Sequence, residues 1–490
     1  MNLGMLLDMA ADGAPDRIAV GSRQGGGITY KELRDRAVAV AAVLERGNAD
    51  HLAAVDVNSE AVPIGLFGAA LAGVPYVPMS YRLADDRLAA QLARVAPALA
   101  ICDERAAARV GDIDGVTLMA RSELLAASQE ASDSATGFTD PDDIAVLLFT
   151  SGTSGEPKAA VLRHRHLASY VIGSVEFMGA AEDDAALVSV PPYHVAGVSA
   201  VLSSVYGGRR LVYLPEFTPE RWVELARAEA VTHAMVVPTM LGRILDVLAR
   251  DGEGLPALRH LSYGGGRMPL PTVERAMELL PHVDFVNAYG LTETSSTIAV
   301  LTPDDHRICF ASDDPGVRGR LASVGKPLPT VEVDIRDGEV WVRGEQVSGE
   351  YRGREATLTE DGWFRTNDSG RLDDDGYLYV EGRLDDVIVR GAENLSPGEI
   401  EDVLIEHPAV AEAAVVGVPD DQWGEVVVAA VVLCTSGSTT AADLQSWVGE
   451  QLRSSRVPTR IEIRAELPYT ETGKLLRRLL KQELTASGDP

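Results

Sequence analysis

The sequence predicts an α/β protein with a large N-terminal domain of parallel-rich sheets and covering helices, a β-rich subdomain, and a small α+β C-terminal domain. Length is the first reason: the chain has 490 residues, whereas single hydrophobic cores stop growing at roughly 250–300. The second reason is the alternation of strand-like and helical segments along the first two thirds, which is typical of parallel sheets. The third is a change near residue 331, where short strands and tight turns replace the helices.

Apolar periodicity defines the elements of the large domain. Leu33, Ala37, Val40 and Leu44 recur at helical spacing and fall on one face of a helix, whereas short unbroken apolar runs between turn residues predict buried strands. The predicted elements are, in order, a helix over 29–45, a strand over 52–57, a helix over 64–72, a short strand at 76–77, a helix over 87–95, and strands over 98–102 and 144–149. The stretch 126–139, rich in Ala, Ser, Asp and Gly, predicts a surface linker.

One apolar segment raises the question of a membrane span. Residues 61–81 carry no charge and are long enough to cross a bilayer. Three prolines, Pro63, Pro75 and Pro78, interrupt the segment, and residues 73–75 form a turn signal. We therefore expect a buried helix followed by a short core strand.

Beyond residue 331 the sequence predicts β-structure and then a separate unit. Strands over 331–335 and 339–343 flank an expected tight turn at 337–338, and a strand at 378–380 follows the acidic turn 373–376. That turn does not fit a calcium loop, because Arg371 would occupy the first ligand position and Gly382 the twelfth. The last unit has a predicted helix over 397–407, strands over 411–418 and 426–433, and a helix over 441–453. We place the domains at 1–384 and 385–490.

Composition excludes several classes of partner. A net charge of −29 argues against nucleic acid and against anionic membranes, both of which favour basic surfaces. Cys102, Cys309 and Cys434 are widely separated and have no metal-ligand spacing, so we expect unpaired thiols in a reducing compartment, the cytoplasm. The N-terminal residues 1–16 lack the basic start of a signal peptide.

The segment 149–158 carries the densest chemical signal in the chain. It follows a predicted buried strand and combines small residues, which let backbone N–H groups converge on a polyanion, with hydroxyl donors and a cation. Its functional residues are Thr150, Ser151, Gly152, Thr153, Ser154, Gly155 and Lys158. The spacing differs from that of the common P-loop. A polar surface loop is the alternative interpretation, but the pattern favours a phosphate cradle.

Four further segments carry residues suited to nucleotide chemistry. They are an apolar, proline-bent stretch at 191–197 with a histidine, an aromatic–glycine–carboxylate stretch at 287–294, a lone aspartate in 364–368, and a lysine after a glycine turn in 468–474. Each is weak alone. Together with the loop, in this order and spacing, they resemble the adenylate-forming superfamily of acyl-CoA synthetases, peptide-synthetase adenylation domains and luciferases. The resemblance covers essentially the whole chain and is closest to acyl-CoA synthetases.

This resemblance implies a site for ATP and Mg²⁺. The loop 150–158 would hold the β- and γ-phosphates, and Glu293, with Thr150 beside it, would bind Mg²⁺, which prefers oxygen ligands. Tyr289 would stack on adenine, and Asp368 would accept hydrogen bonds from both ribose hydroxyls. The other implied nucleotide contacts are Gly264, Gly265, Gly266, Asn287, Ala288, Gly290, Thr292 and Arg383.

The resemblance also implies how the acid is activated. Lys474 would bridge the acyl carboxylate and the α-phosphate as negative charge develops, and His194 would gate the place where carboxylate and thiol meet; Thr292 and Glu293 complete the implied catalytic set. The implied acid pocket is lined by His194, Val195, Gly197, Val237, Tyr263 and Gly264. Apart from Tyr263 and His194 these residues are small and apolar, which indicates a sizeable hydrophobic acid from fatty-acid or natural-product metabolism.

A hinge is implied at Asp385, about which the C-terminal domain would rotate between acyl-AMP formation and transfer to CoA. Gly391 and Ala392 would then line a tunnel for the CoA thiol. The family commonly has a second glycine where this chain has Ala392, and a glycine where it has Asn367. The methyl group of Ala392 occupies space in the implied tunnel, so it bears on thioester formation and not on adenylation.

Three functions are compatible with these residues. The leading hypothesis is an ATP-dependent acid–thiol ligase that makes acyl-CoA. The alternative is an adenylating enzyme that passes acyl-AMP to a separate ligase or a carrier protein, as the change at Ala392 would allow. A nucleotide-binding protein without catalysis is disfavoured, because Lys474, Glu293 and Asp368 are all present.

Overall fold

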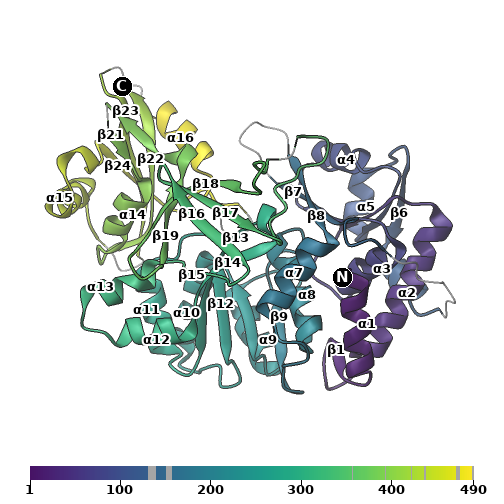
Figure 1. Ribbon diagram of the computed structural model, residues 1–490. Coiled ribbons are helices and arrows are strands. Elements are labelled where there is room, and N and C mark those ends of the chain that lie inside the picture. The colour runs from purple at the N-terminus through teal and green to yellow at the C-terminus, as the bar shows by residue number, and fades with distance from the viewer. Residues whose placement is uncertain are drawn as a thin grey trace.

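The described part of the chain forms four β-sheets and the helices that cover them (Figure 1). The computed structural model describes residues 1–130, 139–150, 157–355, 357–391, 393–420, 422–434, 438–470 and 475–487. Figure 1 shows the six-stranded sheet and its helices at the right and the nine-stranded sheet below the centre. The C-terminal elements lie at the upper left, beyond the four-stranded sheet.

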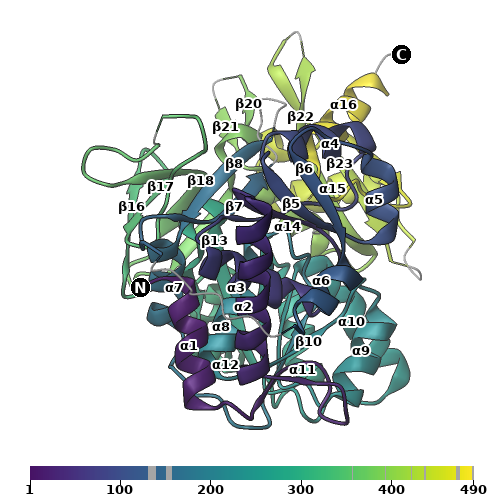
Figure 2. The same ribbon diagram turned by 90° about the vertical axis from the view of Figure 1, so that its right-hand side faces the viewer.

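The six-stranded sheet has the order β6-β5-β3-β4-β7-β8. Its strands are β3 (His51–Val55), β4 (Tyr76–Pro78), β5 (Ala98–Cys102), β6 (Val116–Ala120), β7 (Ile144–Thr150) and β8 (Lys158–Arg163). All neighbours are parallel except β7 and β8. The accompanying helices are α1 (Leu3–Gly13), α2 (Tyr30–Gly47), α3 (Ala61–Ala72), α4 (Asp85–Ala93), α5 (Glu104–Val110) and α6 (Arg121–Ala127). Figure 2 shows α1 and α2 side by side on the near face.

The nine-stranded sheet has the order β15-β14-β13-β12-β11-β9-β10-β1-β2, and its strands from β13 to β1 are parallel. The strands are β1 (Ile18–Val20), β2 (Ile28–Thr29), β9 (Ala185–Val188), β10 (Arg210–Tyr213), β11 (His233–Val236), β12 (His260–Gly264), β13 (Asp284–Leu291), β14 (Ser296–Leu301) and β15 (Lys326–Pro327). The helices are α7 (His164–Ser174), α8 (Val195–Gly207), α9 (Pro219–Ala228), α10 (Pro238–Asp251), α11 (Leu270–Leu279), α12 (Pro303–Ala311) and α13 (Pro315–Arg318), with the 3₁₀ turns η1 (Thr292–Thr294) and η2 (Gly319–Ala322).

The remaining two sheets follow residue 331. The antiparallel four-stranded sheet contains β16 (Val331–Arg336), β17 (Glu339–Gly344), β18 (Phe364–Leu372) and β19 (Leu378–Arg383). After η3 (Leu384–Asp386), the last sheet contains β20 (Ile388–Arg390), β21 (Glu393–Leu395), β22 (Val410–Asp420), β23 (Gly424–Leu433) and β24 (Arg460–Arg464). Its helical segments are α14 (Pro397–Ile405), α15 (Ala441–Gln451), η4 (Ser454–Arg456) and α16 (Arg477–Ala486).

The predicted α/β architecture is confirmed, and the elements predicted from periodicity are present with shifted ends. Thr29 caps α2 through a capping box with Glu32, as a Thr three residues before a Glu predicts. Helix α3 begins at Ala61, because Pro63 lies in its first turn, where a missing N–H costs nothing. All its residues from Ala61 to Leu71 are buried, and no helix in the described part of the chain has the length and apolar character needed to cross a bilayer.

Three differences from the sequence predictions stand out. The segment predicted as a linker over 126–139 begins within α6, and its residues 131–138 lie outside the described residues. Strand β24 and helix α16 were not predicted. β24 alternates charged and apolar residues in only five positions and forms through its parallel pairing with β23.

Two buried histidines at the start of α7 act as neutral hydrogen-bond acceptors. The N–H of Leu3 donates to Nδ1 of His164, and the N–H of Arg163 donates to Nδ1 of His166. Burial lowers the pKa of His164 to about 4 and that of His166 to about 3. A protonated ring could not accept these bonds, so both rings are neutral in the folded protein near pH 7.

We expect acid to destabilise the fold between pH 6.5 and about 4. The unfolded histidines take up protons near pH 6.5 while the folded rings do not, so the free energy of unfolding falls as pH falls. At about 1.4 kcal/mol per pH unit, His164 contributes at most ~3 kcal/mol to this loss. Thermal unfolding midpoints of wild type and His164→Asn, measured from pH 7 to 4, should converge, because Asn keeps an acceptor but does not titrate. If the unfolding midpoints of the two proteins fall by the same amount from pH 7 to 4, the titration of His164 does not cause the loss of stability.

Candidate active site

Most of the predicted site residues gather at the carboxyl ends of the parallel strands of the nine-stranded sheet. Val237 directly follows β11, Gly264 ends β12, and Tyr289 and Gly290 lie near the end of β13. His194 follows β9 and precedes α8. Because these strands are adjacent and parallel, segments far apart in the sequence meet at one edge. Ligands of open α/β sheets bind at this edge.

Two glycines let the backbones at this edge pack closely. A Cβ atom on Gly264 would lie 2.2 Å from the carbonyl oxygen of Ala288, and one on Gly290 would lie 1.9 Å from that of Ser296. Any side chain at either position would push the neighbouring strand away. Beyond Gly264, residues 265–267 are exposed, so their peptide groups are open to a ligand.

Asp368 lies in a cluster assembled from three predicted residues. It is 5% exposed. Its Oδ1 atom accepts a hydrogen bond from Nη1 of Arg383 at 2.9 Å, and its Oδ2 atom accepts one from the hydroxyl of Tyr289 at 2.5 Å. Burial, and then the Asp368 charge, raise the pKa of Tyr289 well above 10, so the phenol stays a donor. Both carboxylate oxygens therefore have protein partners, which a ribose would have to share or displace.

Glu293 lies in η1 and is held by a residue that the sequence did not single out. The hydroxyl of Tyr351 donates to the Glu293 carboxylate, and burial followed by the Glu293 charge raises the Tyr351 pKa. The carbonyl oxygen of Glu293 accepts the N–H of Ser348 at 2.8 Å. Tyr351 was missed because it is a lone aromatic residue in a polar segment, with no local pattern around it.

Two residues of the predicted phosphate loop, Thr150 and Lys158, reach the same place from the six-stranded sheet. Thr150 ends β7 and pairs with Lys158, which begins the antiparallel strand β8. The ammonium group of Lys158 lies 5.3 Å from the centre of the Tyr351 ring, within reach of a cation–π attraction. Tyr351 thus brings Lys158 and Glu293 together. The loop residues Ser151, Gly152, Thr153, Ser154 and Gly155 lie outside the described residues.

The donor set at Glu293 fits Mg²⁺. The described residues contain no group of three or more His, Cys, Asp or Glu side chains that could hold a metal on their own. Mg²⁺ is usually bound through one or two carboxylates together with substrate phosphates and water. One carboxylate, Glu293, with Lys158 of the predicted phosphate loop nearby, matches that pattern.

Three residues of the predicted acid pocket, His194, Val195 and Gly197, lie at the start of α8. His194 is the N-cap residue of this helix, and its ring centre is 4.8 Å from that of Tyr193. Val195 and Gly197 form the first turn of α8. The side chain of Val237 lies near Gly265, where an added Cβ atom would be 3.6 Å from the valine Cγ1. Val237 and the glycine segment are thereby brought together as the sequence predicts.

Two predicted site residues turn their side chains into the fold. The Tyr263 ring is fully buried in the core beneath the strand edge, and its hydroxyl hydrogen-bonds to Nε2 of His306 at 2.8 Å. Asn287 donates its amide to the carbonyl oxygen of Ser323 at 3.0 Å. The Tyr263 ring therefore packs on the core side of its strand, and its contact with the acid stays a prediction.

The predicted hinge and thiol-tunnel residues lie where the C-terminal elements begin. Asp385 is in η3 and accepts a hydrogen bond from the side chain of Asn367. Gly391 ends the described part of the β20 turn, and its N–H donates to the carbonyl oxygen of Trp423. Ala392 and Lys474 lie outside the described residues, although Tyr469 and Leu475 on either side of residues 470–474 form a β-bridge.

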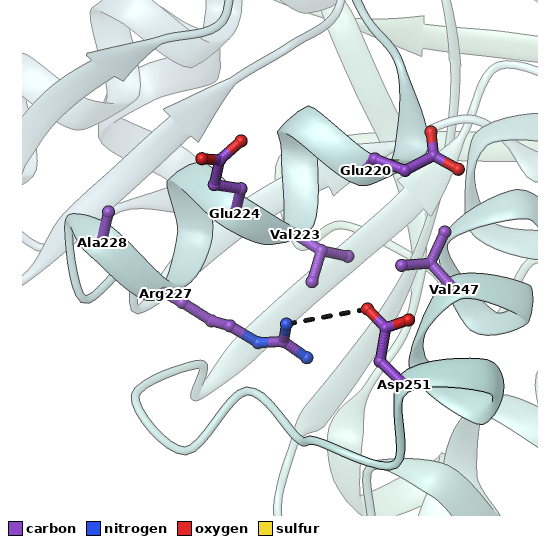
Figure 3. A pocket seen from close by; sticks show the side chains of 7 residues that line it. All are labelled: Glu220, Val223, Glu224, Arg227, Ala228, Val247 and Asp251. Carbon is purple, nitrogen blue, oxygen red and sulfur yellow. Dashed lines mark ion pairs between the residues drawn. The ribbon is translucent and has the colours of Figure 1, made fainter.

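A separate surface pocket of about 590 Å³ lies between α9 and α10 (Figure 3). It is lined by Glu220, Val223, Glu224, Arg227, Ala228, Val247 and Asp251. Arg227 is drawn toward Asp251 by an ion pair of 3.9 Å. None of the predicted site residues lines this pocket, and its three carboxylates oppose the binding of a nucleotide.

Comparison with known proteins points to one family. The family model described as "AMP-binding enzyme" matches residues 7–352, and the model described as "AMP-binding enzyme C-terminal domain" matches residues 399–474. A 2-succinylbenzoate–CoA ligase of Bacillus cereus (strain ATCC 14579) is 31% identical over 487 residues, which are 96% of each chain.

Solved structures agree with the sequence comparison. The o-succinylbenzoate CoA synthetase of Bacillus subtilis, in complex with its acyl-adenylate intermediate, has a TM-score of 0.82 and 29% identity, with 97% of both chains covered. The same enzyme in complex with ATP and a magnesium ion has a TM-score of 0.83 and 29% identity, with 97% of this chain and 99% of that chain covered.

Proposed function

The chain belongs to the AMP-binding enzyme family, and on that premise we propose that its acid substrate is an aromatic keto-diacid of the 2-succinylbenzoate type. The observation that carries this proposal is the 31% identity to a 2-succinylbenzoate–CoA ligase over 96% of both chains. The apolar residues Val195 and Val237 of the predicted acid pocket support it, because apolar lining suits an aromatic ring.

The reaction is that of an AMP-forming acid–thiol ligase. A carboxylate attacks the α-phosphorus of ATP, giving acyl-AMP and pyrophosphate, and the thiol of CoA then displaces AMP to give acyl-CoA. ATP, Mg²⁺ and CoA are its cofactors and co-substrates. No general base is needed for the first step, because a carboxylate is already a nucleophile at neutral pH.

In the proposed first half-reaction, residues of this chain would hold the ribose and place positive charge beside the phosphates of ATP. Asp368 would hold the ribose hydroxyls, with Arg383 and Tyr289 fixing the carboxylate. Glu293 would bind Mg²⁺, which supplies positive charge to the phosphates when bound. Lys474 would neutralise the charge that develops on the α-phosphate. The contacts that support these roles are those of Asp368 and Glu293 described above.

In the proposed second half-reaction, the unit 385–490 would turn about Asp385 and present Gly391 and Ala392 to the thiol. CoA ligases are among the relatives that match along nearly the whole chain, so the alternative in which acyl-AMP passes to a separate ligase or carrier protein is not favoured. The domain limits 1–384 and 385–490 are part of this proposal. A cytoplasmic location is also proposed, with the absence of disulfides among the described cysteines as its support.

Turnover with a panel of acids tests the proposed substrate. Pyrophosphate release and CoA thioester, measured by mass, should both appear with 2-succinylbenzoate at a kcat/KM at least about tenfold above that of benzoate, 4-phenylbutanoate and decanoate. One buried methylene distinguishes substrates by about 10–200-fold, and lost polar contacts by more. The monoacids in the panel serve as matched controls for the ring and the chain.

Two outcomes would contradict parts of this proposal separately. Equal activity with a monoacid would remove the diacid assignment and keep the ligase. Pyrophosphate release without thioester for every acid would restore the adenylate-transfer alternative and direct attention to Ala392.

A further inference from the structure

We propose that Asn367 is a positioning residue that couples the ribose carboxylate to the hinge and thereby sets the balance between the two half-reactions. The inference rests on the proposed function, since the hinge at Asp385 and the role of Asp368 are parts of it. Asn367 has no part in the family pattern, which commonly has glycine at this position. That pattern therefore assigns no role to the Asn367 side chain.

Asn367 lies at a bulge in β18. Glu339 of β17 pairs with Ser369, and Trp341 pairs with Arg365, so one residue of β17 faces three residues of β18. The backbone of Asn367 has φ of 60°, in the left-handed region that favours glycine and tolerates asparagine. Bulges near active sites re-aim side chains. Here the bulge directs Asp368 inward, where it is buried beside Tyr289 and Arg383.

The amide of Asn367 points to the hinge. Its Nδ2 atom donates to Oδ2 of Asp385 at 2.8 Å, and its backbone N–H donates to the Glu339 carboxylate at 3.1 Å. Glu339 is itself 4% exposed and is paired with Arg365. The bulge is thus anchored to β17, and the amide ties the first residue of the C-terminal unit to that anchor.

The neighbouring residues Asn367 and Asp368 of β18 bind two residues close to the predicted hinge. Asp368 binds Arg383, and Asn367 binds Asp385. A ribose that competes for the oxygens of Asp368 would loosen its bond to Arg383, two residues before Asp385. Nucleotide binding and the position of the hinge are then linked through adjacent side chains, because both contacts start from one bulge.

The hydrogen bond between Asn367 and Asp385 is one of several contacts that hold the C-terminal elements in this arrangement. Arg267, which follows the glycine segment, forms an ion pair with Asp402 of α14. The hydroxyl of Ser396 donates to the carbonyl oxygen of Glu381 at 3.2 Å. Because neither of these contacts involves Asn367, we expect a shift in the balance of arrangements and no loss of fold.

Asn367→Gly is a closely matched test, because glycine keeps the left-handed backbone and removes only the amide. Asn367→Asp also keeps the backbone and places a second carboxylate against Asp385. The first measurement is hydrogen–deuterium exchange of peptides covering 384–390, with and without AMP, which needs no acid substrate. Exchange should be faster in both variants than in wild type, most in Asn367→Asp, and the change caused by AMP should shrink. Equal exchange in wild type and both variants would overturn the proposal.

The second measurement separates positioning from a general structural role. We compare the rate of ATP–pyrophosphate exchange with the rate of thioester formation from supplied acyl-AMP. The ratio of these two rates should differ from that of wild type by about three- to tenfold, in the same direction for both variants. An unchanged ratio in variants whose unfolding temperature matches wild type would overturn the proposal. The hydrogen–deuterium exchange experiment tests the bond between Asn367 and Asp385 even if no acid in the panel is activated. Failure of this inference can therefore be distinguished from failure of the proposed function.

Discussion

Replacing Lys474 by alanine is expected to reduce acyl-AMP formation by at least about 10²–10³-fold, the cost of removing one group that stabilises developing charge. The lysine would offset the negative charge that grows on the α-phosphate and the attacking carboxylate. Its loss acts on the transition state, so kcat should fall while the KM for ATP changes little. Acid-dependent pyrophosphate release measures this step directly.

The matched control is Lys481→Ala, a lysine seven positions later whose ammonium group forms an ion pair with Glu425 at 2.6 Å. This side chain is partly exposed, and such pairs contribute about 0–1 kcal/mol, so pyrophosphate release should stay within about twofold of wild type. Thioester formation from supplied acyl-AMP should also survive in Lys474→Ala, because the second half-reaction forms no new bond to phosphorus. Equal losses in the two lysine variants would show that Lys474 has no special role.

Glu293→Gln is expected to have the second largest effect, a loss of about 10²-fold or more in adenylation, because Mg²⁺ contributes several kcal/mol of charge stabilisation. The amide oxygen of Gln can still accept the hydrogen bond from Tyr351, so the segment around η1 should stay folded. What the change removes is the negative charge that attracts the metal. The Mg²⁺ concentration that gives half-maximal activity should rise, and pyrophosphate release titrated with MgCl₂ checks this.

Glu350→Gln is the control for Glu293→Gln. Glu350 is next to Tyr351 in the sequence, but its carboxylate pairs with Arg163 at 2.8 Å and does not contact Glu293. We expect its Mg²⁺ titration to match that of wild type. If the two glutamine variants shift the titration equally, the effect is one of general charge, and Glu293 does not bind the metal.

Much of the fold could be predicted from the sequence because its signals are local. The capping box at Thr29 and the apolar spacing from Leu33 to Leu44 are contained within one helix. The order of the sheets could not be predicted, since the pairing of β9 with β11 and of β1 with β10 depends on contacts between distant segments. Helix α16 was missed for a different reason: its two buried residues, Leu480 and Leu484, are a short apolar signal in a strongly charged stretch.

The candidate site was predictable as a set of residues and not as a set of contacts. Resemblance to a family named Tyr289, Asp368 and Arg383 one at a time, and the structure alone shows that they form one hydrogen-bonded cluster. Tyr263 was expected in the acid pocket because it adjoins Gly264, and the sequence does not say which face of its strand packs against the core. The role of Tyr351 depends on packing between β8 and η1, which leaves no trace in the local sequence.

The close backbone packing at Gly264 and Gly290 also bears on the redesign of this enzyme for other acids. Variant libraries that include either glycine would contain mostly misfolded members, since every side chain meets the carbonyl oxygen of Ala288 or Ser296. Val195 and Val237, near the same edge, already carry side chains, although Val237 is only 9% exposed. Substrate range can therefore be evolved through the two valines, while the two glycines should be kept out of the randomised set.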